Sequence, residues 1–175
     1  MILICYDGSQ DARTAIERAS GLFRSQPAVV LSVWEDFSNV LLRTGAALGG
    51  AAIDFEEIDQ ASEASARERA EEGARLAREA GFDAQPRVAV RGVTIWETIL
   101  EQADDVQASA VVLGSRGLTG VKSILLGSVS QAVLNHADRA VMVVPSPDAA
   151  GRRADHRHAK PNRGPASGAR GSRRR

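Results

Sequence analysis

Short apolar runs recur along the first 145 residues at intervals that suit strands. They lie at Ile2–Tyr6, Val29–Trp34, Arg87–Val90, Ala110–Leu113 and Val141–Val144. Between them, apolar residues return every three or four positions, which is the spacing of one helical face. Strands that alternate with helices predict parallel βαβ units. We therefore expect an α/β fold, a doubly wound five-stranded parallel sheet with helices on both faces, as in Rossmann-like proteins.

Four helices are expected in the intervening stretches. The first covers Ala12–Phe23, and the second is a long charged helix from about Asp54 to Ala80. Thr94 followed by Glu97 fits a capping box that predicts the start of the third helix, and the fourth is expected to begin at Ser128. In a sheet of this kind, ligands bind beyond the carboxyl ends of the strands, where the winding reverses.

Charge is divided unevenly along the chain. The 175 residues carry 22 basic and 22 acidic side chains. From Gly151 onward there are nine basic residues and one acidic residue, Asp155, so this end carries +8 and residues 1–150 carry −8. The basic end is rich in Gly, Pro and Ser and has few large apolar residues, so it cannot bury enough surface to fold alone. We expect one domain, residues 1–148, and a basic, disordered tail, residues 149–175.

The composition argues against several classes of protein. No apolar run approaches the ~20 residues that a membrane-spanning helix requires, and the chain begins with a strand-like run instead of a charged signal region. Cys5 is the single cysteine, so neither an intrachain disulfide nor a thiolate metal cluster can form. We expect a cytoplasmic protein with no metal site of its own side chains, in which Cys5 is an inert core thiol.

A glycine-rich stretch after the fourth predicted strand is the strongest candidate for a binding site. It runs from Gly114 to Gly117 (Gly-Ser-Arg-Gly), and after nine residues Gly127 and Ser128 open the last predicted helix. Glycine lets backbone amides approach a ligand, and a helix start adds unpaired N–H groups and the positive end of the helix dipole. An anion such as phosphate could bind there. Asp7 ends the first strand and would lie nearby if the first and fourth strands are neighbours.

Plainer interpretations stay open at this point. Gly114 and Gly117 could be ordinary turn residues, and Ser128 with Gln131 fits a capping box that only starts a helix. Two other phosphate-binding motifs are absent. The segment 120–123 has valine where a P-loop requires the glycine before lysine, and no G-x-G-x-x-G follows the first strand.

The full pattern resembles the ATP-binding branch of the universal stress protein family. Asp7 at the end of the first strand and the spacing G-x2-G-x9-G-[ST] that begins at Gly114 carry the resemblance, which covers about residues 1–146. It implies a sheet of the adenine nucleotide alpha hydrolase-like type. The tail after Pro145 has no counterpart in the family pattern, and the small-residue segment Thr44–Ala52 falls where the family varies most.

The resemblance implies that nine residues bind an adenine nucleotide. Asp7 would accept a hydrogen bond from the adenine amine, and Val33 matches a position whose backbone contacts the base. Arg116, together with Lys122, could add positive charge or could simply be solvated. The remaining residues would surround the ribose and the phosphates: Gly114, Gly117, Gly127, Ser128, Val129 and Ser130.

The ligand and the assembly are also implied by the resemblance. ATP with Mg²⁺ or Mn²⁺ would be the cofactor, the ion being held mainly by phosphate oxygens, with AMP or a cyclic nucleotide as alternatives. Family members pair as homodimers through their last strand, which corresponds here to Val141–Val144. The resemblance thus implies a regulatory dimer that senses ATP in the stress response.

An enzyme and a nucleic-acid-binding module are the competing hypotheses. ATP hydrolysis would need a residue that positions water, and the predicted domain offers one histidine, His136, at a helix end where the dipole favours it structurally. We expect binding, with hydrolysis absent or slow. The nine tail cations could attract nucleic acid or an acidic partner, but no aromatic residues are interleaved for stacking, so such binding would be nonspecific.

Overall fold

A computed structural model describes residues 1–23, 25–37, 40–41, 54–118, 126–145 and 151. Four predicted features lie outside these ranges: the segment Thr44–Ala52, Lys122, the domain boundary between residues 148 and 149, and the tail beyond Gly151. Each of these therefore stays a prediction.

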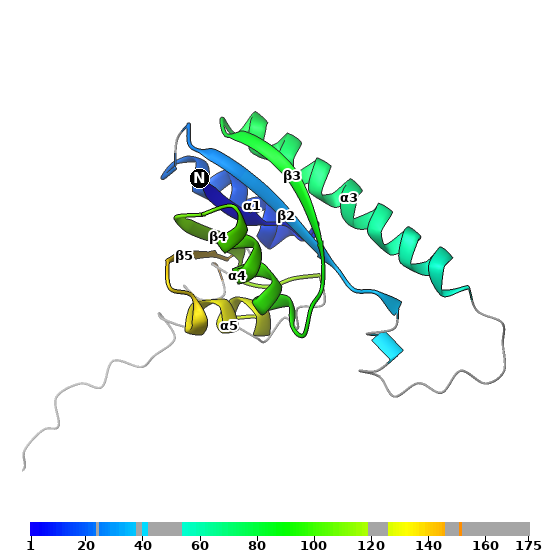
Figure 1. Cartoon of the computed structure of the whole chain (residues 1–175). Helices are drawn as coiled ribbons and strands as arrows, with labels where there is room; N and C mark the ends of the chain where they lie inside the picture. Colours follow the sequence, from blue (N-terminus) through cyan, green and yellow to red (C-terminus); the bar gives the residue numbers. More distant parts are fainter. Residues whose placement is uncertain (24, 38–39, 42–53, 119–125, 146–150, 152–175) are drawn as a thin grey trace, which may run out of the picture.

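The centre of the molecule is a five-stranded parallel sheet (Figure 1). Its strands are β1 (Ile2–Cys5), β2 (Pro27–Trp34), β3 (Asp83–Val90), β4 (Ala110–Gly114) and β5 (Ala140–Val144). They are arranged in the order β3-β2-β1-β4-β5, and all neighbours are parallel. The chain winds outward from β1 first to one side and then to the other. The predicted doubly wound sheet is confirmed, and β1 and β4 are neighbours.

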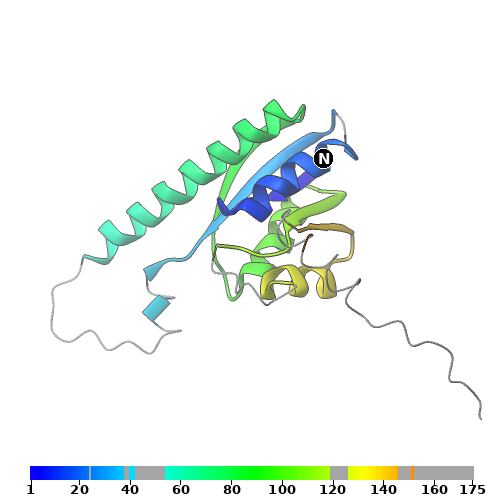
Figure 2. The same cartoon turned by 180° about the vertical axis from the view of Figure 1, so that it is seen from behind.

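Helices cover both faces of the sheet, as the two opposite views show (Figures 1 and 2). One face carries α1 (Gln10–Ser20) and α3 (Phe55–Glu79), and the other carries α4 (Ile95–Asp105) and α5 (Ser128–His136). Side chains of a strand alternate between the faces, so Ile4 packs in the cluster under α1 and α3 whereas Leu3 packs under α4 and α5. None of the described helices combines the length and the apolar character that crossing a bilayer demands.

The edge strand β3 begins four residues before the predicted start at Arg87. Pro86 lies inside it, and proline has no N–H to donate to a sheet. Such a residue is tolerated in β3 because this strand pairs with β2 on one side and forms one edge of the sheet. The opposite edge is β5, whose sequence AVMVV contains neither proline nor a charged residue. The two edges therefore differ in their capacity to pair with another strand.

Candidate functional site

A cavity lies at the carboxyl ends of β1, β2 and β4, where the winding of the sheet reverses. Its volume is about 450 Å³, within the roughly 300–1,000 Å³ of typical small-molecule pockets. The residues predicted from the sequence all line it: Asp7, Val33, Gly114, Arg116, Gly117, Gly127, Ser128, Val129 and Ser130. Residues that are far apart in the chain are thus brought together at one site.

The apolar wall of this cavity was not predicted. It is formed by Leu31 from β2, Leu113 from β4, and Ile95 and Ile99 from α4. In the sequence, Ile95 and Ile99 belong to an apolar helical stripe, which predicts contact with the sheet but does not show where that contact ends. The first two turns of α4 lie at the carboxyl ends of the strands, so these side chains border the cavity as well as the core. An apolar wall of this kind suits a flat, weakly polar ring.

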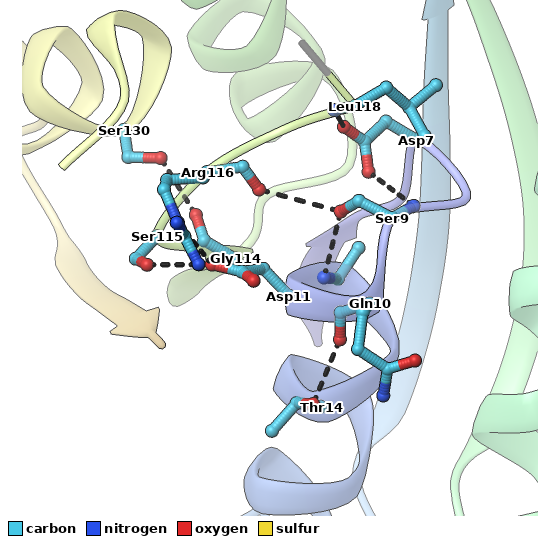
Figure 3. Close-up of polar contacts among 11 residues, drawn as sticks. Asp7, Ser9, Gln10, Asp11, Thr14, Gly114, Ser115, Arg116, Leu118 and Ser130 are labelled. Carbon is cyan, nitrogen blue, oxygen red and sulfur yellow. Dashed lines mark hydrogen bonds and ion pairs between the residues drawn. The ribbon is translucent and has the colours of Figure 1, made fainter. Parts of the chain in front are cut away.

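Asp7 lies directly against the glycine loop, which we define as residues 114–118. Its Oδ1 accepts a hydrogen bond from the amide of Ser9 at 3.0 Å, and its Oδ2 accepts one from the amide of Leu118 at 3.2 Å (Figure 3). A Cβ atom on Gly117 would lie 2.6 Å from the same Oδ2, closer than atoms can pack. The carboxylate and the loop therefore fit together because residue 117 has no side chain.

Gly114 has a packing role that the sequence does not reveal. A Cβ atom at this position would lie 2.7 Å from the carbonyl carbon of Asp11 and 2.8 Å from the amide nitrogen of Ala12. Both atoms belong to the first turn of α1, which cannot move away without unpacking the sheet. Glycine here lets the end of β4 pack directly on α1, which accounts for the residue before any ligand contact is considered.

The helix α5 begins without a side-chain cap. Its N-cap is Gly127, which has no side chain to offer, and Ser128 is the first helical residue. The capping box that Ser128 and Gln131 could have formed is therefore absent at this helix start. The amide of Gly127 donates to the carbonyl oxygen of Ser115 at 2.7 Å. The following amides of the first turn have no partner within the helix, and they border the cavity.

Two of the predicted side chains are engaged within the protein. The Ser130 hydroxyl is buried and donates to the carbonyl oxygen of Gly114 at 2.8 Å (Figure 3). The Arg116 side chain is only 11% exposed, and its Nε lies 3.4 Å from Oδ2 of Asp11. Arg116 is therefore not the solvated loop cation that the sequence allowed as an alternative. At Ser130, the backbone amide in the first turn of α5 is the group that remains for a ligand.

Cys5 lines the cavity at the end of β1. Burial raises the pKa of its thiol to about 12, and the negative charge of Asp7 adds to the effect. The thiol therefore stays neutral at physiological pH, and a neutral thiol is a poor nucleophile. This agrees with the prediction of an inert cysteine, although its position is at the cavity wall as well as in the core.

We expect the fold to lose stability as pH rises from about 9 toward 12. Cys5 would ionise near pH 9.0 in the unfolded chain but keeps its proton to about pH 12 in the folded one. Over this window the unfolded state loses protons that the native state retains, so Cys5 alone contributes a slope of at most about 1.4 kcal/mol per pH unit. Urea unfolding at about pH 8, 10 and 11 measures how the free energy of unfolding changes with pH, and Cys5→Ala is the comparison.

Cys5→Ala should still lose some stability as pH rises, because burial also raises the pKa of Tyr6 to about 12. The difference in stability between wild type and Cys5→Ala should therefore shrink as pH rises. A difference that stays constant from pH 8 to pH 11 would contradict the assignment to Cys5.

The architecture and the cavity define an α/β protein with a ligand site at the switch point of a doubly wound sheet. The model of the universal stress protein family matches residues 1–145, and the chain belongs to this family. It is 30% identical over 150 residues to universal stress protein Sll1388 of Synechocystis, which covers 82% of this chain and 96% of that protein. It is 31% identical over 148 residues to Rv2005c of Mycobacterium tuberculosis, but spans only 44% of that longer protein.

Solved structures share the fold. The hypothetical protein MJ0577 superposes with a TM-score of 0.66 at 23% identity, covering 82% of this chain and 94% of that one. A universal stress protein solved in complex with cAMP superposes with a TM-score of 0.59 at 23% identity, covering 83% and 96% of the two chains. Relatives from Archaeoglobus fulgidus and Arabidopsis thaliana were solved with dAMP and AMP, respectively.

Proposed function

We propose that this protein binds ATP in the cavity between Asp7 and the start of α5, and acts in the cytoplasm as a dimeric regulator in the stress response. The observation that carries the proposal is the meeting of Asp7, the glycine loop and an uncapped helix start at one cavity. Structural neighbours that hold cAMP, dAMP or AMP support an adenine nucleotide as the ligand class.

The two ends of the cavity offer different chemistry to such a ligand. At one end, the apolar wall with Val33 suits the adenine ring, and each Asp7 oxygen has lone-pair capacity beyond the one backbone amide that it accepts. At the other end, the first turn of α5 offers backbone N–H groups and the positive end of a helix dipole to the phosphates. We expect Mg²⁺ or Mn²⁺ to enter with ATP, since Mg²⁺ takes few protein ligands beside nucleotide phosphates.

Slow ATP hydrolysis is the second candidate, and His136 gives it no support. His136 is the last residue of α5, at the opposite end of the helix from the cavity. Its exposed ring stacks on Trp96 with ring centroids 4.3 Å apart, and its Nδ1 lies 2.9 Å from the carbonyl oxygen of Ala132. These contacts give the histidine a structural role at a helix end, so we favour binding over catalysis.

Two measurements test the proposal. Mass spectrometry of small molecules released from the purified protein should detect ATP, AMP or a cyclic nucleotide. Calorimetric titration should then show binding of ATP, with GTP as the control for recognition of the base. A folded protein that binds no adenine nucleotide would refute the proposal, and equal affinity for ATP and GTP would remove the role of Asp7 as an adenine contact.

The unequal sheet edges support a dimer through the last strand. Pro86 removes a donor from β3, whereas all five residues of β5 retain their N–H groups. An open strand edge without charge or proline is a ready surface for pairing with a second strand. The partner that we propose for β5 is the same strand of another copy.

Deleting residues 151–175 is expected to leave ATP affinity and dimerisation nearly unchanged. The cavity-lining residues and the last strand all precede residue 146. Any binding to nucleic acid should disappear with the nine tail cations, and in the full chain it should fall steeply with salt because it depends on counterion release.

Full-length and truncated protein should be compared by ATP titration, sedimentation and an RNA-binding assay at two salt concentrations. A full-length variant with the tail Arg and Lys residues replaced by Gln is the matched control, because it keeps the length and removes the charge. If truncation abolishes ATP binding or the dimer, the predicted domain boundary is wrong.

A further inference from the structure

We propose that Asp11 is a positioning residue for the phosphate end of the cavity. Its carboxylate joins the first turn of α1 to the glycine loop and so holds in place the backbone groups that would contact the phosphates. The inference rests on the proposed function and names a residue that the glycine spacing does not include.

The carboxylate of Asp11 is buried and directed at the glycine loop. Asp11 is the second residue of α1 and is 6% exposed. Its Oδ2 accepts a hydrogen bond of 2.8 Å from the Ser115 hydroxyl and lies 3.4 Å from Nε of Arg116 (Figure 3). Ser115 has no exposed surface. A buried charge is held in this way only where its partners offset the cost of removing it from water.

Ser115 connects this carboxylate to two other elements. Its amide donates to the carbonyl oxygen of Val144 at the end of β5, and its own carbonyl accepts from the amide of Gly127, both at 2.7 Å. The side chain of Ser115 thus faces α1 while its backbone is bonded to β5 and to the N-cap of α5. A shift of Ser115 would therefore also move Gly127 and the amides of the first turn of α5, which border the cavity.

Ser9 makes a second set of contacts between the start of α1 and the glycine loop. Ser9, the N-cap of α1, accepts a hydrogen bond from the amide of Ala12 and donates to the carbonyl oxygen of Arg116 at 3.5 Å. The close approach of α1 to Gly114 adds direct backbone packing. The start of α1 and the glycine loop therefore form one unit, in which Asp11 supplies the charged contact.

A carboxylate suits this position for electrostatic reasons. An acidic side chain in the first turn of a helix is stabilised by the helix dipole, and it also compensates the mostly buried guanidinium of Arg116. Removing one partner of a buried pair is far more disruptive than the net value of the pair, because the other charge remains in a poorly solvated place. Loss of Asp11 should therefore displace Arg116 and, with it, the loop.

The test separates the phosphate end from the adenine end. In Asp11→Ala, affinity for ATP should fall about three- to tenfold, which corresponds to the loss of roughly one hydrogen bond, while affinity for adenosine should fall less. Asp11→Asn should recover only part of the loss, because its amide oxygen can still accept from Ser115 but carries no charge to compensate Arg116. Glu17→Ala, an exposed position on the same helix, is the matched control and should bind as wild type does.

Ser115→Ala provides the test if Asp11→Ala does not fold, because it removes the bonded hydroxyl and leaves the charge pair intact. It should likewise lower the affinity for ATP more than the affinity for adenosine. Unchanged ATP affinity in a folded Asp11→Ala or Ser115→Ala protein, or an equal loss for ATP and adenosine, would overturn the inference. An increase in ATP affinity would also overturn it, since Asp11 would then act by repelling the phosphates.

Hydrogen exchange without ligand distinguishes failure of this inference from failure of the proposed function. Amides of residues 115–118 should exchange faster in Asp11→Ala than in wild type or Glu17→Ala, whether or not nucleotide binds. Unchanged exchange would show that Asp11 does not position the loop. Faster exchange in a protein whose wild type binds no adenine nucleotide would confirm the contact and refute both the nucleotide site and the phosphate role given to Asp11.

Discussion

Replacing Gly117 by valine is expected to abolish ATP binding in a protein that still folds. The Cβ atom would lie 2.6 Å from Oδ2 of Asp7, and a branched side chain would push the loop and the carboxylate further apart. Gly117 is exposed, so the loop can move outward without unpacking the core. We expect at least about a hundredfold loss of affinity, since both Asp7 and the backbone of the loop leave their positions.

Calorimetric titration with ATP measures this loss, and thermal unfolding shows whether the fold survives. Gly21→Val is the matched control: Gly21 ends α1 with φ of −71°, and a Cβ atom there would be 3.6 Å from its nearest neighbour, an ordinary contact. It should bind ATP as wild type does. If Gly117→Val folds and keeps its affinity, the glycine loop is not part of a nucleotide site.

Asp7→Ala is expected to weaken ATP binding about ten- to a hundredfold while changing the affinity for inorganic triphosphate much less. A hydrogen bond from the adenine amine to a carboxylate contributes roughly 1.5–3 kcal/mol, and inorganic triphosphate has no such donor. Parallel titrations with ATP and with inorganic triphosphate measure the two losses of affinity. Equal losses for both would instead indicate that Asp7 acts at the phosphates or the metal.

Asp54→Ala is the control for this substitution. Asp54 is also an aspartate that accepts backbone amides, here those of Glu56 and Glu57 at the start of α3, but it is not among the cavity-lining residues. Its loss should cost about 1 kcal/mol of stability, as the removal of a helix cap does, and leave ATP affinity unchanged. The comparison therefore separates ligand contact from general support of the backbone.

The fold could be predicted because each of its signals is local. Four apolar residues in a row at Ala110–Leu113 predict a strand buried on both faces, and β4 is buried and lies between β1 and β5. The start of β3 could not be predicted in the same way. Pro86 counts against a strand unless that strand is known to form an edge, and the strand order that makes it an edge depends on contacts between distant segments.

The sequence indicated many of the residues that line the cavity, but it did not indicate which contacts each of them makes. The glycine spacing and Asp7 indicated which residues would converge. That Gly114 makes room for α1, or that the Ser130 hydroxyl bonds within the protein, depends on what packs beside each residue in space. Asp11 was missed for the same reason: an acidic residue in the first turn of a helix is common, and nothing local shows that Ser115 lies against it.

The proline in β3 also bears on what happens when many copies of this chain accumulate. A sheet with two open edges can add neighbours at both, and such head-to-tail addition grows into filaments. Because Pro86 removes a donor from β3, growth in that direction would be hindered. The pairing that we propose, of β5 with another β5, would be self-complementary and would consume the open edge of each copy. Pro86 lies in β3, at the opposite edge of the sheet from β5. It would thus favour assembly that stops at a pair, and it would disfavour polymerisation of the concentrated protein.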